Sequence, residues 1–317
     1  MSVFKFGIMG AGNIANRFCD AVRRINGDIQ VAAVSSKSEE RARSFAEKND
    51  IPRYYVGYEN MLSSEELDAV YIATTNNFHY SDCLLAIEHG LPVLCEKPLM
   101  MSEGEAQEVF KKAEEKNVFV MEGMWSRFIP CVQKAHEWIS SGRIGTVKIA
   151  NYLGGINAPE DHRIYVPELG GGAMYDLAVY PFEIVTYLVG QKLVDYKYSI
   201  RWLNSQIDEN DSLILNFEEC DATIQSSLHT RIPSPSGFYG TEGFIQMEKT
   251  HMASKVSLYD EAFNLVESFE HPCENGFEWE IEHVRDCVRS GLIESPIMPW
   301  KDTLLCAKVF DRCLRGE

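Results

Sequence analysis

The sequence predicts a two-domain α/β protein: a doubly wound parallel sheet in residues 1–122, then an α/β domain with a large, mainly antiparallel open sheet in residues 123–317. Strand-like and helix-like segments alternate in the first third, which is typical of a parallel sheet covered by helices on both faces. A glycine turn joins the first strand to the first helix. After about residue 123, strands follow one another without helices between them, as in antiparallel sheets.

Each element of the first domain has a local signal. Residues 3–9 form an apolar run that ends in glycines, and residues 13–25 have helical spacing. Ser38 precedes two glutamates, and Ser102 stands three residues before Glu105, which are N-cap and capping-box signals. The expected strands are 3–9, 29–35, 68–74, 91–95 and 118–121, and the expected helices begin at 13, 38, 78 and 102.

The second domain is expected to bind substrate and to mediate oligomerisation. It is expected to start with a helix at residues 130–140 and to end with helices near 276–289 and 301–314, the last of which can pack back on the first domain. The strand-like segments between them are 147–153, 193–202, 212–217, 222–228 and 244–247. No linker rich in serine and glycine separates the two domains.

Composition excludes several classes of protein. A net charge of −17 disfavours binding to nucleic acid. No apolar stretch approaches the ~20 residues of a membrane span. The 9 cysteines lack CxxC spacing and the histidines lack metal-ligand spacing, so we expect reduced thiols, a cytoplasmic location and no metal.

The glycine turn predicts a dinucleotide site. Gly10 permits the tight turn, Gly12 lets the backbone approach a pyrophosphate, and Ala15 is small enough for helix–strand packing. Asn13 and Ile14 open the helix, whose N-terminal N–H groups favour an anion. The alternative interpretation is a glycine turn of the kind found in any α/β protein.

The end of the second strand indicates which dinucleotide is preferred. NAD enzymes usually place a carboxylate there to hold the ribose hydroxyls, whereas this chain has Ser35, Ser36 and Lys37. A cation and hydroxyl groups suit a 2′-phosphate, so the expected cofactor is NADP, with NAD possible. Alternatively, Lys37 is only a solvated surface residue.

Lys97 is a candidate acid or base, because it follows Glu96 at the carboxyl end of a parallel strand, where open α/β sheets bind ligands. A lysine pKa near ~10.4 must be lowered for this role, by burial or a nearby positive charge. A strand-end lysine can equally be an ion-pair partner.

A second candidate cluster follows the glycine run at residues 170–172. If the next residues are helical, Asp176 and Tyr180 lie on one face and could bracket a substrate hydroxyl. The alternative is an ordinary buried hydrogen bond between them. Arg163, just before the glycines, could contact a polar substrate or neutralise neighbouring acids.

Over nearly its whole length the chain resembles the glucose–fructose oxidoreductase / inositol dehydrogenase (Gfo/Idh/MocA) family, and its motifs are most similar to the glucose–fructose oxidoreductase and dimeric dihydrodiol dehydrogenase branch. The motifs occur in the family's order. They are the turn at 10–15, Ala73-Thr74-Thr75-Asn76 with His79, Glu96-Lys97-Pro98, the glycine run before Asp176, Tyr239-Gly240-Thr241-Glu242-Gly243, and Glu294-Ser295-Pro296.

The resemblance implies an N-terminal Rossmann domain and a role for several residues. Lys97 and Tyr180 would be the catalytic pair, with Asp176 orienting the lysine or the substrate. Trp125 and Arg127 would line the substrate pocket, although they could also be core packing and a surface ion pair. The further positions implied to hold the cofactor are Thr74, Asn76, His79, Glu96 and Lys97. Many relatives have His where this chain has Tyr180, and Pro where it has Thr75.

The expected function is therefore that of an NADP-dependent oxidoreductase. It would transfer a hydride between the nicotinamide and a carbinol carbon of a sugar, polyol or cyclic diol. The alternative is a non-catalytic dinucleotide-binding sensor or regulatory protein of the same fold, although such a protein has no need for a proton-transfer set. We expect a homodimer or a higher homo-oligomer, because an open sheet face requires cover.

Overall fold

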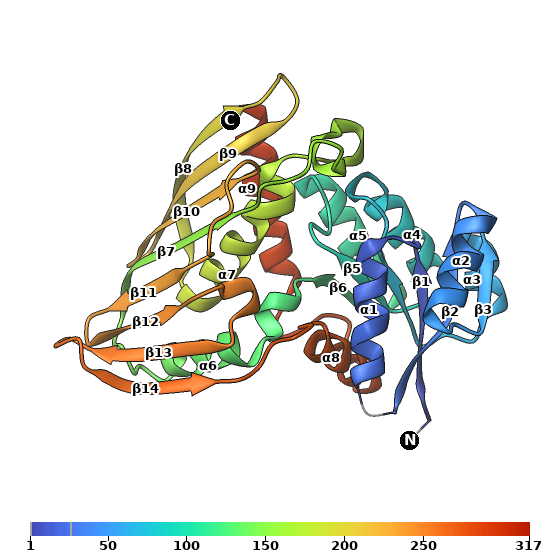
Figure 1. Cartoon of the computed structure of the whole chain (residues 1–317), viewed down its shortest axis with the longest axis horizontal. Coiled ribbons are helices and arrows are strands. Elements are labelled where there is room, and N and C mark those ends of the chain that lie inside the picture. Colours follow the sequence, from blue (N-terminus) through green and yellow to red (C-terminus); the bar gives the residue numbers. More distant parts are fainter. Residues whose placement is uncertain (1, 26) are drawn as a thin grey trace. The chain divides into compact units, whose positions relative to one another are not determined.

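The computed structural model describes residues 2–25 and 27–317, which form two compact units (Figure 1). Unit 1 contains the residues up to Gly123 together with Asn275–Asp311, and unit 2 contains Met124–Glu274 together with Arg312–Glu317. The first boundary lies next to the predicted one. Residues 275–311, which lie within the second domain expected at 123–317, belong to unit 1; the sequence predicts such a return for the last helix only.

Unit 1 is built on a six-stranded parallel sheet with the order β3-β2-β1-β4-β5-β6. The strand order reverses between β1 and β4, and ligands of open α/β sheets bind outside the carboxyl ends of the strands at such a point. The strands are β1 (Phe4–Met9), β2 (Ile29–Ser36), β3 (Arg53–Val56), β4 (Ala69–Ile72), β5 (Val93–Glu96) and β6 (Val120–Gly123).

The helices of the first 123 residues begin where the sequence signals them. The Ser38 hydroxyl accepts a hydrogen bond from Arg41 N (3.4 Å), and the Ser102 hydroxyl accepts one from Glu105 N (3.3 Å), so both predicted N-caps are confirmed. The helices are α1 (Asn13–Arg24), α2 (Glu39–Asn49), α3 (Tyr58–Ser64), a 3₁₀ turn at Asn76–Phe78, α4 (His79–Glu88) and α5 (Glu103–Lys116).

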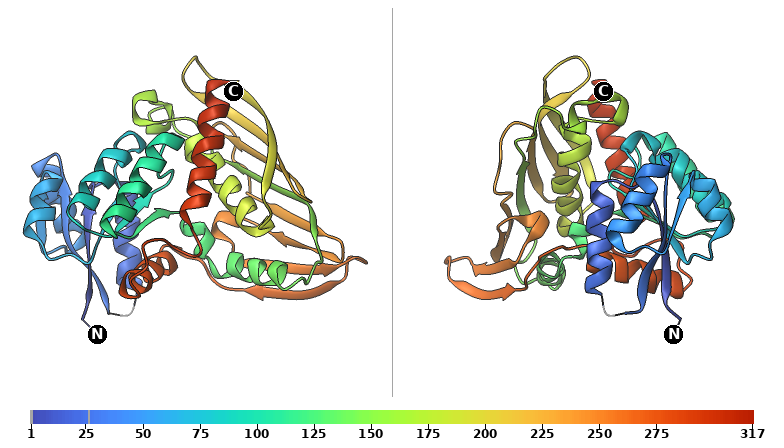
Figure 2. Two further views of the ribbon diagram at one scale, coloured as in Figure 1. Left: turned by 180° about the vertical axis from the view of Figure 1, so that it is seen from behind. Right: turned by 45° about the vertical axis from the view of Figure 1, so that its right-hand side comes forward.

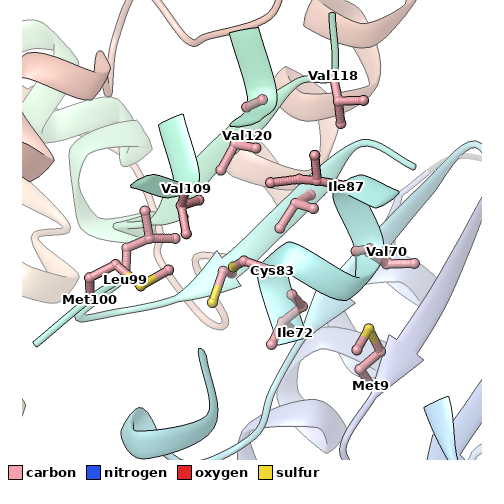
Figure 3. Packing of buried hydrophobic residues seen from close by; sticks show 14 of the residues in the cluster. Met9, Val70, Ile72, Cys83, Ile87, Leu99, Met100, Val109, Val118 and Val120 are labelled. Atoms are coloured by element: carbon pink, nitrogen blue, oxygen red, sulfur yellow. The ribbon is translucent and has the colours of Figure 1, made fainter. Parts of the chain in front are cut away.

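The core of unit 1 fills the space between this sheet and its helices. Figure 3 shows Val70, Ile72 and Val120 of the strands pointing toward Cys83 and Ile87 of α4, with Val109 of α5 nearby. Strands β4, β5 and β6 are buried at every position, as expected for parallel strands covered on both faces. Burial of each such aliphatic side chain contributes roughly 1.5–3 kcal/mol.

Helices α8 (Glu278–Arg289) and α9 (Trp300–Arg315) end the chain, and α9 up to Asp311 belongs to unit 1. Trp300 Nε1 donates to Val120 O (2.8 Å) and its ring stacks on Phe110 with centroids 4.9 Å apart. The Asn275 side-chain amide donates to Arg17 O (2.9 Å). These contacts attach residues 275–311 to the parallel sheet and its helices.

Unit 2 is built on an eight-stranded sheet with the order β14-β13-β12-β11-β7-β10-β9-β8, in which only β7 and β10 pair in parallel. Helices α6 (Pro130–Ser140) and α7 (Val179–Val189) pack on one face (Figure 2). The strands are β7 (Val147–Gly155), β8 (Leu193–Trp202), β9 (Asp208–Phe217), β10 (Asp221–Ser227), β11 (Ser236–Gly240), β12 (Gly243–Met247), β13 (Lys255–Asp260) and β14 (Leu265–Glu270).

The other face of this sheet carries apolar side chains that unit 2 itself does not cover. Ile149 is 50% exposed and Ile214 is 45% exposed. Three half-buried aromatic rings stack across neighbouring strands, with centroids 5.8 Å apart for Tyr239 and Phe244 and 4.7 Å apart for Phe244 and Tyr259. Among the described residues, no helix is both long and apolar enough to cross a membrane.

Candidate active site

The glycine turn of unit 1 has the conformation that a dinucleotide site needs. Gly10 adopts a φ of +105°, and a Cβ at this position would lie 2.8 Å from Ala73 O, so only glycine fits without strain. Gly10 N donates to Ser35 O (2.9 Å). No described side chain caps the N-terminus of α1 after Gly12. The first N–H groups of this helix therefore suit an anion such as a pyrophosphate.

The end of β2 carries one exposed cation and no carboxylate between residues 35 and 38. The Ser35 side chain is buried and donates to Tyr55 O (3.3 Å), while the Ser36 hydroxyl accepts from Ser38 N (3.3 Å). Lys37 Nζ lies 3.5 Å from the centroid of the Phe78 ring. This contact holds the ammonium group close to the surface of unit 1.

Hydrogen bonds with buried side chains hold the loop after β4 in place. Thr74 Oγ1 donates to Asp82 Oδ2 (2.8 Å), and burial raises the pKa of Asp82 to about 6 against the effect of this bond. The buried His79 ring lies between Thr74 O (3.2 Å) and Pro98 O (2.8 Å), so it joins the loop after β4 to the loop after β5. Asn76 is also buried, at the start of the 3₁₀ turn.

Glu96 orients the start of the loop that carries Lys97. Tyr71 Oη donates to Glu96 Oε1 (2.5 Å), and Lys97 N donates to Glu96 Oε2 (3.3 Å). Tyr71 is itself fixed by a stacked contact with Phe18, with ring centroids 4.0 Å apart. Burial raises the pKa of Glu96, opposed by these hydrogen bonds and by the Lys97 charge. Lys97 is half-buried.

Glu122 holds the other end of this loop, and sequence analysis missed it. Its carboxylate accepts hydrogen bonds from Leu99 N (3.0 Å) and from Thr303 Oγ1 (2.7 Å). The backbone beyond Lys97 is thus tied to β6 and to α9. The signal was weak, because an isolated glutamate at a strand end does not reveal a partner in a helix near the end of the chain.

In unit 2, Trp125 and Tyr180 come together. Trp125 Nε1 donates to Tyr180 Oη (3.2 Å), and the two rings meet edge to face with centroids 6.1 Å apart. An indole N–H can only donate, so the phenol oxygen is an acceptor in this bond. The His251 ring is also near, 6.1 Å from the Tyr180 ring. Sequence analysis did not single out His251, because no local motif surrounds it.

Asp176 and Tyr180 lie on one continuous helical segment, as expected. Met174–Ala178 forms a π-helical turn that runs into α7. The Asp176 carboxylate is buried and is held by both terminal nitrogens of Arg163, with Nη2–Oδ1 at 2.7 Å and Nη1–Oδ2 at 3.2 Å. Of the two interpretations of Arg163, this geometry favours neutralisation of an acid. A bidentate pair of this kind keeps the carboxylate oriented.

Arg127 was expected to line a substrate pocket, but its side chain is buried in an ion pair. Its side chain and that of Glu183 are both 0% exposed and form an ion pair. Arg127 Nε also donates to Glu183 O (3.1 Å). A guanidinium group buried in this way fits a role in bracing α7 rather than in touching a substrate. The alternative of a surface ion pair is wrong about the location, because the pair is in the core of unit 2.

The structure thus gathers the predicted residues into two groups. Unit 1 holds the glycine turn, the ends of β2 and β4, and the Glu96–Lys97 loop around one edge of its sheet. Unit 2 holds Trp125 and Tyr180 in contact, with Asp176 and Arg163 on and beside the same helix. Within the described residues, no group of three His, Cys, Asp or Glu side chains could hold a metal ion.

Comparisons with known proteins identify the family of both domains. Residues 4–124 match the model of an oxidoreductase family with an NAD-binding Rossmann fold (GFO/IDH/MocA), and residues 132–246 match the GFO/IDH/MocA C-terminal domain. The trans-1,2-dihydrobenzene-1,2-diol dehydrogenase of Xenopus tropicalis is 32% identical, over 98% of this chain and 97% of that protein.

Two solved structures share the fold at lower identity. One is the complex of KijD10, a 3-ketoreductase from Actinomadura kijaniata, with NADP and TDP-benzene (TM-score 0.85, 23% identity, 98% of this chain and 97% of that one). The other is levoglucosan dehydrogenase with NADH and levoglucosan (TM-score 0.88, 17% identity, 99% and 97%). The chain therefore belongs to the GFO/IDH/MocA family and is an oxidoreductase with an NAD(P)-binding Rossmann fold.

Proposed function

We propose that the chain is an NADP-dependent dehydrogenase or reductase that acts on a carbinol group of a sugar, polyol or cyclic diol. The observation that carries this proposal is the contact between Trp125 and Tyr180, in which the indole orients the phenol group in unit 2. The relative named a diol dehydrogenase, which is similar over the full chain, supports the same class of substrate.

The residues of unit 1 fit a dinucleotide. The uncapped N-terminus of α1 and the tight turn at Gly10 would hold the pyrophosphate of the dinucleotide. The ends of β4 and β5 would hold the remainder of the cofactor. When bound, the cofactor supplies the hydride donor or acceptor. Cofactor-holding positions on these edges are Gly10, Gly12, Asn13, Ile14, Ser35, Ser36, Lys37, Thr74, Asn76, His79, Glu96 and Lys97.

Lys97 and Tyr180 would move the proton of the substrate hydroxyl. Oxidation of an alcohol requires a group that takes this proton, and reduction of a ketone requires one that gives it. The indole N–H on the Tyr180 oxygen stabilises negative charge there. Asp176, oriented by Arg163, would hold the substrate or the lysine in place. Ser35 and His79 would contribute mainly by fixing the loops, since their side chains already bond to backbone carbonyls.

The preference for NADP over NAD rests on Lys37. No acidic side chain stands at the end of β2 to repel a 2′-phosphate, and Lys37 is exposed at this position. Its contact with Phe78 is worth roughly 0.5–1 kcal/mol at an exposed site. An ion pair between Lys37 and a 2′-phosphate can replace this contact with the Phe78 ring.

The proposal is tested by turnover of purified protein. We expect reduction of NADP⁺ with at least one member of a panel of sugars, inositols and cyclic diols. Lys97→Met should lower kcat by roughly 10²–10⁴-fold, a much larger factor than any increase in the Kd for NADPH. Lys111→Met, an exposed lysine on α5, is the matched control. Absence of turnover with every substrate, or a Lys97→Met enzyme as active as Lys111→Met, would contradict the proposal.

We also infer that the chain self-associates through the uncovered face of the unit 2 sheet. Ile149 and Ile214 expose about half of their surfaces there, beside the stacked aromatic rings. Sedimentation should give a dimer or a higher oligomer, and Ile214→Glu should shift it toward monomer. None of the nine cysteines, all of which lie in the described residues, forms a disulfide, and eight of them are buried, which supports a reducing, cytoplasmic location.

A further inference from the structure

Two buried aspartates of β9 face the helix that carries Asp176 and Tyr180. Trp202 pairs with Asp208 and Arg201 pairs with Asn210, so β9 has one extra residue at this point. Such a bulge changes which side chains share a face. Asp208 and Asp211, three positions apart, consequently point to the same side, where they are 2% and 1% exposed.

Asp208 binds the first residues of that helix. Its Oδ2 accepts a hydrogen bond from Met174 N (2.5 Å), and the carboxylate also accepts from the backbone N–H of Ala173. Gly172, with a φ of +120°, allows this approach, because a Cβ there would overlap Asp208 Oδ1. The helix has no capping side chain of its own at this end. Asp208 therefore fixes where the helix begins.

Asp211 stands behind Asp208. Its Oδ2 accepts from Ser226 Oγ (2.9 Å), whereas its Oδ1 is buried with no hydrogen-bond donor in the described residues. The neighbouring carboxyl group of Asp208 is within hydrogen-bonding reach. Two ionised carboxylates cannot form a hydrogen bond with each other, since each can only accept hydrogen bonds. One proton between them satisfies the orphaned oxygen and removes the repulsion.

We propose that Asp208 and Asp211 share one proton, carried by Asp211, and act as a positioning pair for the helix that presents Asp176 and Tyr180. The role in turnover rests on the proposed function, whereas the effect on the helix does not. Neither residue need touch a substrate. Asp208 sets the helix start through backbone N–H groups, and protonated Asp211 keeps the Asp208 carboxylate in place.

The surroundings of the pair support a single shared proton. The groups that face it are the N–H groups of Ala173 and Met174, the Ser226 hydroxyl on β10 and the Cys313 thiol near the end of α9. Burial raises the pKa of that thiol to about 12, so it is neutral. Within the described chain, no lysine, arginine or histidine forms an ion pair with either aspartate.

The shared proton makes folding depend on pH. Burial, together with the Asp208 charge, raises the pKa of Asp211 to about 9, against the hydrogen bond from Ser226. An aspartate in the unfolded chain loses its proton near pH ~4. Between these values the folded state binds more protons, so the free energy of unfolding contributed by this group falls as pH rises. Asp211→Asn retains a hydrogen-bond donor at this position but does not titrate.

Hydrogen exchange of the full chain tests the pair without any substrate. In Asp208→Ala, which removes the acceptor, we expect peptides covering residues 172–180 to exchange at least about tenfold faster. In Asp211→Asn, which keeps the donor, they should stay within about twofold of wild type. Asp195→Ala, an exposed aspartate of β8, is the control. Peptides from 255–270 should not change, which separates a local effect from a general loss of stability.

Two outcomes would overturn the proposal: unchanged exchange at 172–180 in Asp208→Ala, or exchange in Asp211→Asn as fast as in Asp208→Ala. If Asp208→Ala does not fold, urea unfolding of wild type and Asp211→Asn from pH 5 to 9 decides. The wild-type free energy should fall more steeply with pH, and parallel profiles would refute the shared proton. A wild type without turnover would contradict the proposed function and leave these readouts intact.

Turnover then links the pair to catalysis. Asp208→Ala should lower kcat with little change in the Kd for NADPH. In a Tyr180→Phe background, Asp208→Ala should lower kcat by a smaller factor, because its effect is transmitted through the helix that carries Tyr180. Fully multiplicative losses would contradict a positioning role.

Discussion

The sites of the two units are built in different ways. In unit 1, the cofactor edge is made of backbone and loop ends: a glycine with a positive φ, an uncapped helix start and loops fixed by Glu96, His79 and Glu122. In unit 2, the site is made of side chains from separate segments, with Trp125 bonded to Tyr180 and Arg163 bonded to Asp176.

The two sites therefore differ in the substitutions that they tolerate. A backbone site depends on which residues can adopt its conformation, so it fails when a side chain is added. A site made of packed side chains depends on partners, so it fails when one partner is removed and a buried polar group is left unpaired. Four substitutions test this contrast.

The largest effect is expected from breaking the buried ion pair of unit 2. Arg127→Met leaves the Glu183 carboxylate buried without its cation and should lower the free energy of unfolding by roughly 3–5 kcal/mol in urea titrations. Arg143→Met is the control, because its pair with Glu267 is 39% exposed on both sides and should cost ~1 kcal/mol or less. Equal losses would remove the contrast between buried and exposed partners.

Adding a methyl group should damage the backbone site of unit 1. Gly10→Ala combines a positive φ with a clash against Ala73 O, at a cost of roughly 1–3 kcal/mol. Calorimetry should show NADPH binding weakened at least about tenfold. Gly90 also has a positive φ (+69°), but the space around its Cβ position is open, so Gly90→Ala should bind NADPH normally. Normal binding by both variants would contradict the role of the turn.

Lys37→Ala should change the preference for NADP over NAD without a direct effect on the chemical step. Loss of its charge should weaken NADP binding about tenfold, or ~1.4 kcal/mol, and leave the Kd for NAD nearly unchanged. Lys48→Ala on α2 is a control of the same type in unit 1. An unchanged ratio of the two dissociation constants would show that Lys37 only packs on Phe78.

Trp125→Phe should have the smallest effect, because it keeps an aromatic ring at this position while it removes the hydrogen bond to Tyr180. One such bond is worth ~0.5–1.5 kcal/mol, so kcat should fall about three- to tenfold at constant Kd for NADPH. Trp202→Phe, an exposed residue of β8, is the control. An unchanged kcat in Trp125→Phe, or an equal loss in the control, would contradict a role for the hydrogen bond to Tyr180.

Sequence analysis predicted the parallel sheet, its helix caps and the glycine turn because these depend on neighbouring residues. It missed β3, β11, β13 and β14, which are short or mixed in polarity. It allowed the last helix to pack back on the first domain, but it did not assign residues 275–289 to unit 1, since the contact of Asn275 with Arg17 joins distant segments. Asp208, Asp211 and His251 were not predicted for the same reason. A bulge in β9 brings the two aspartates to the helix that carries Tyr180, and long-range packing brings His251 close to the Tyr180 ring.

The most direct test of the account is a double-mutant cycle between Lys97 and Tyr180 with NADP⁺ and an accepted alcohol. If both groups move the same proton, Lys97→Met and Tyr180→Phe should each cost orders of magnitude in kcat, and the double variant should be little worse than the more damaged single one. Losses that simply multiply, or a Tyr180→Phe enzyme with wild-type kcat, would contradict it.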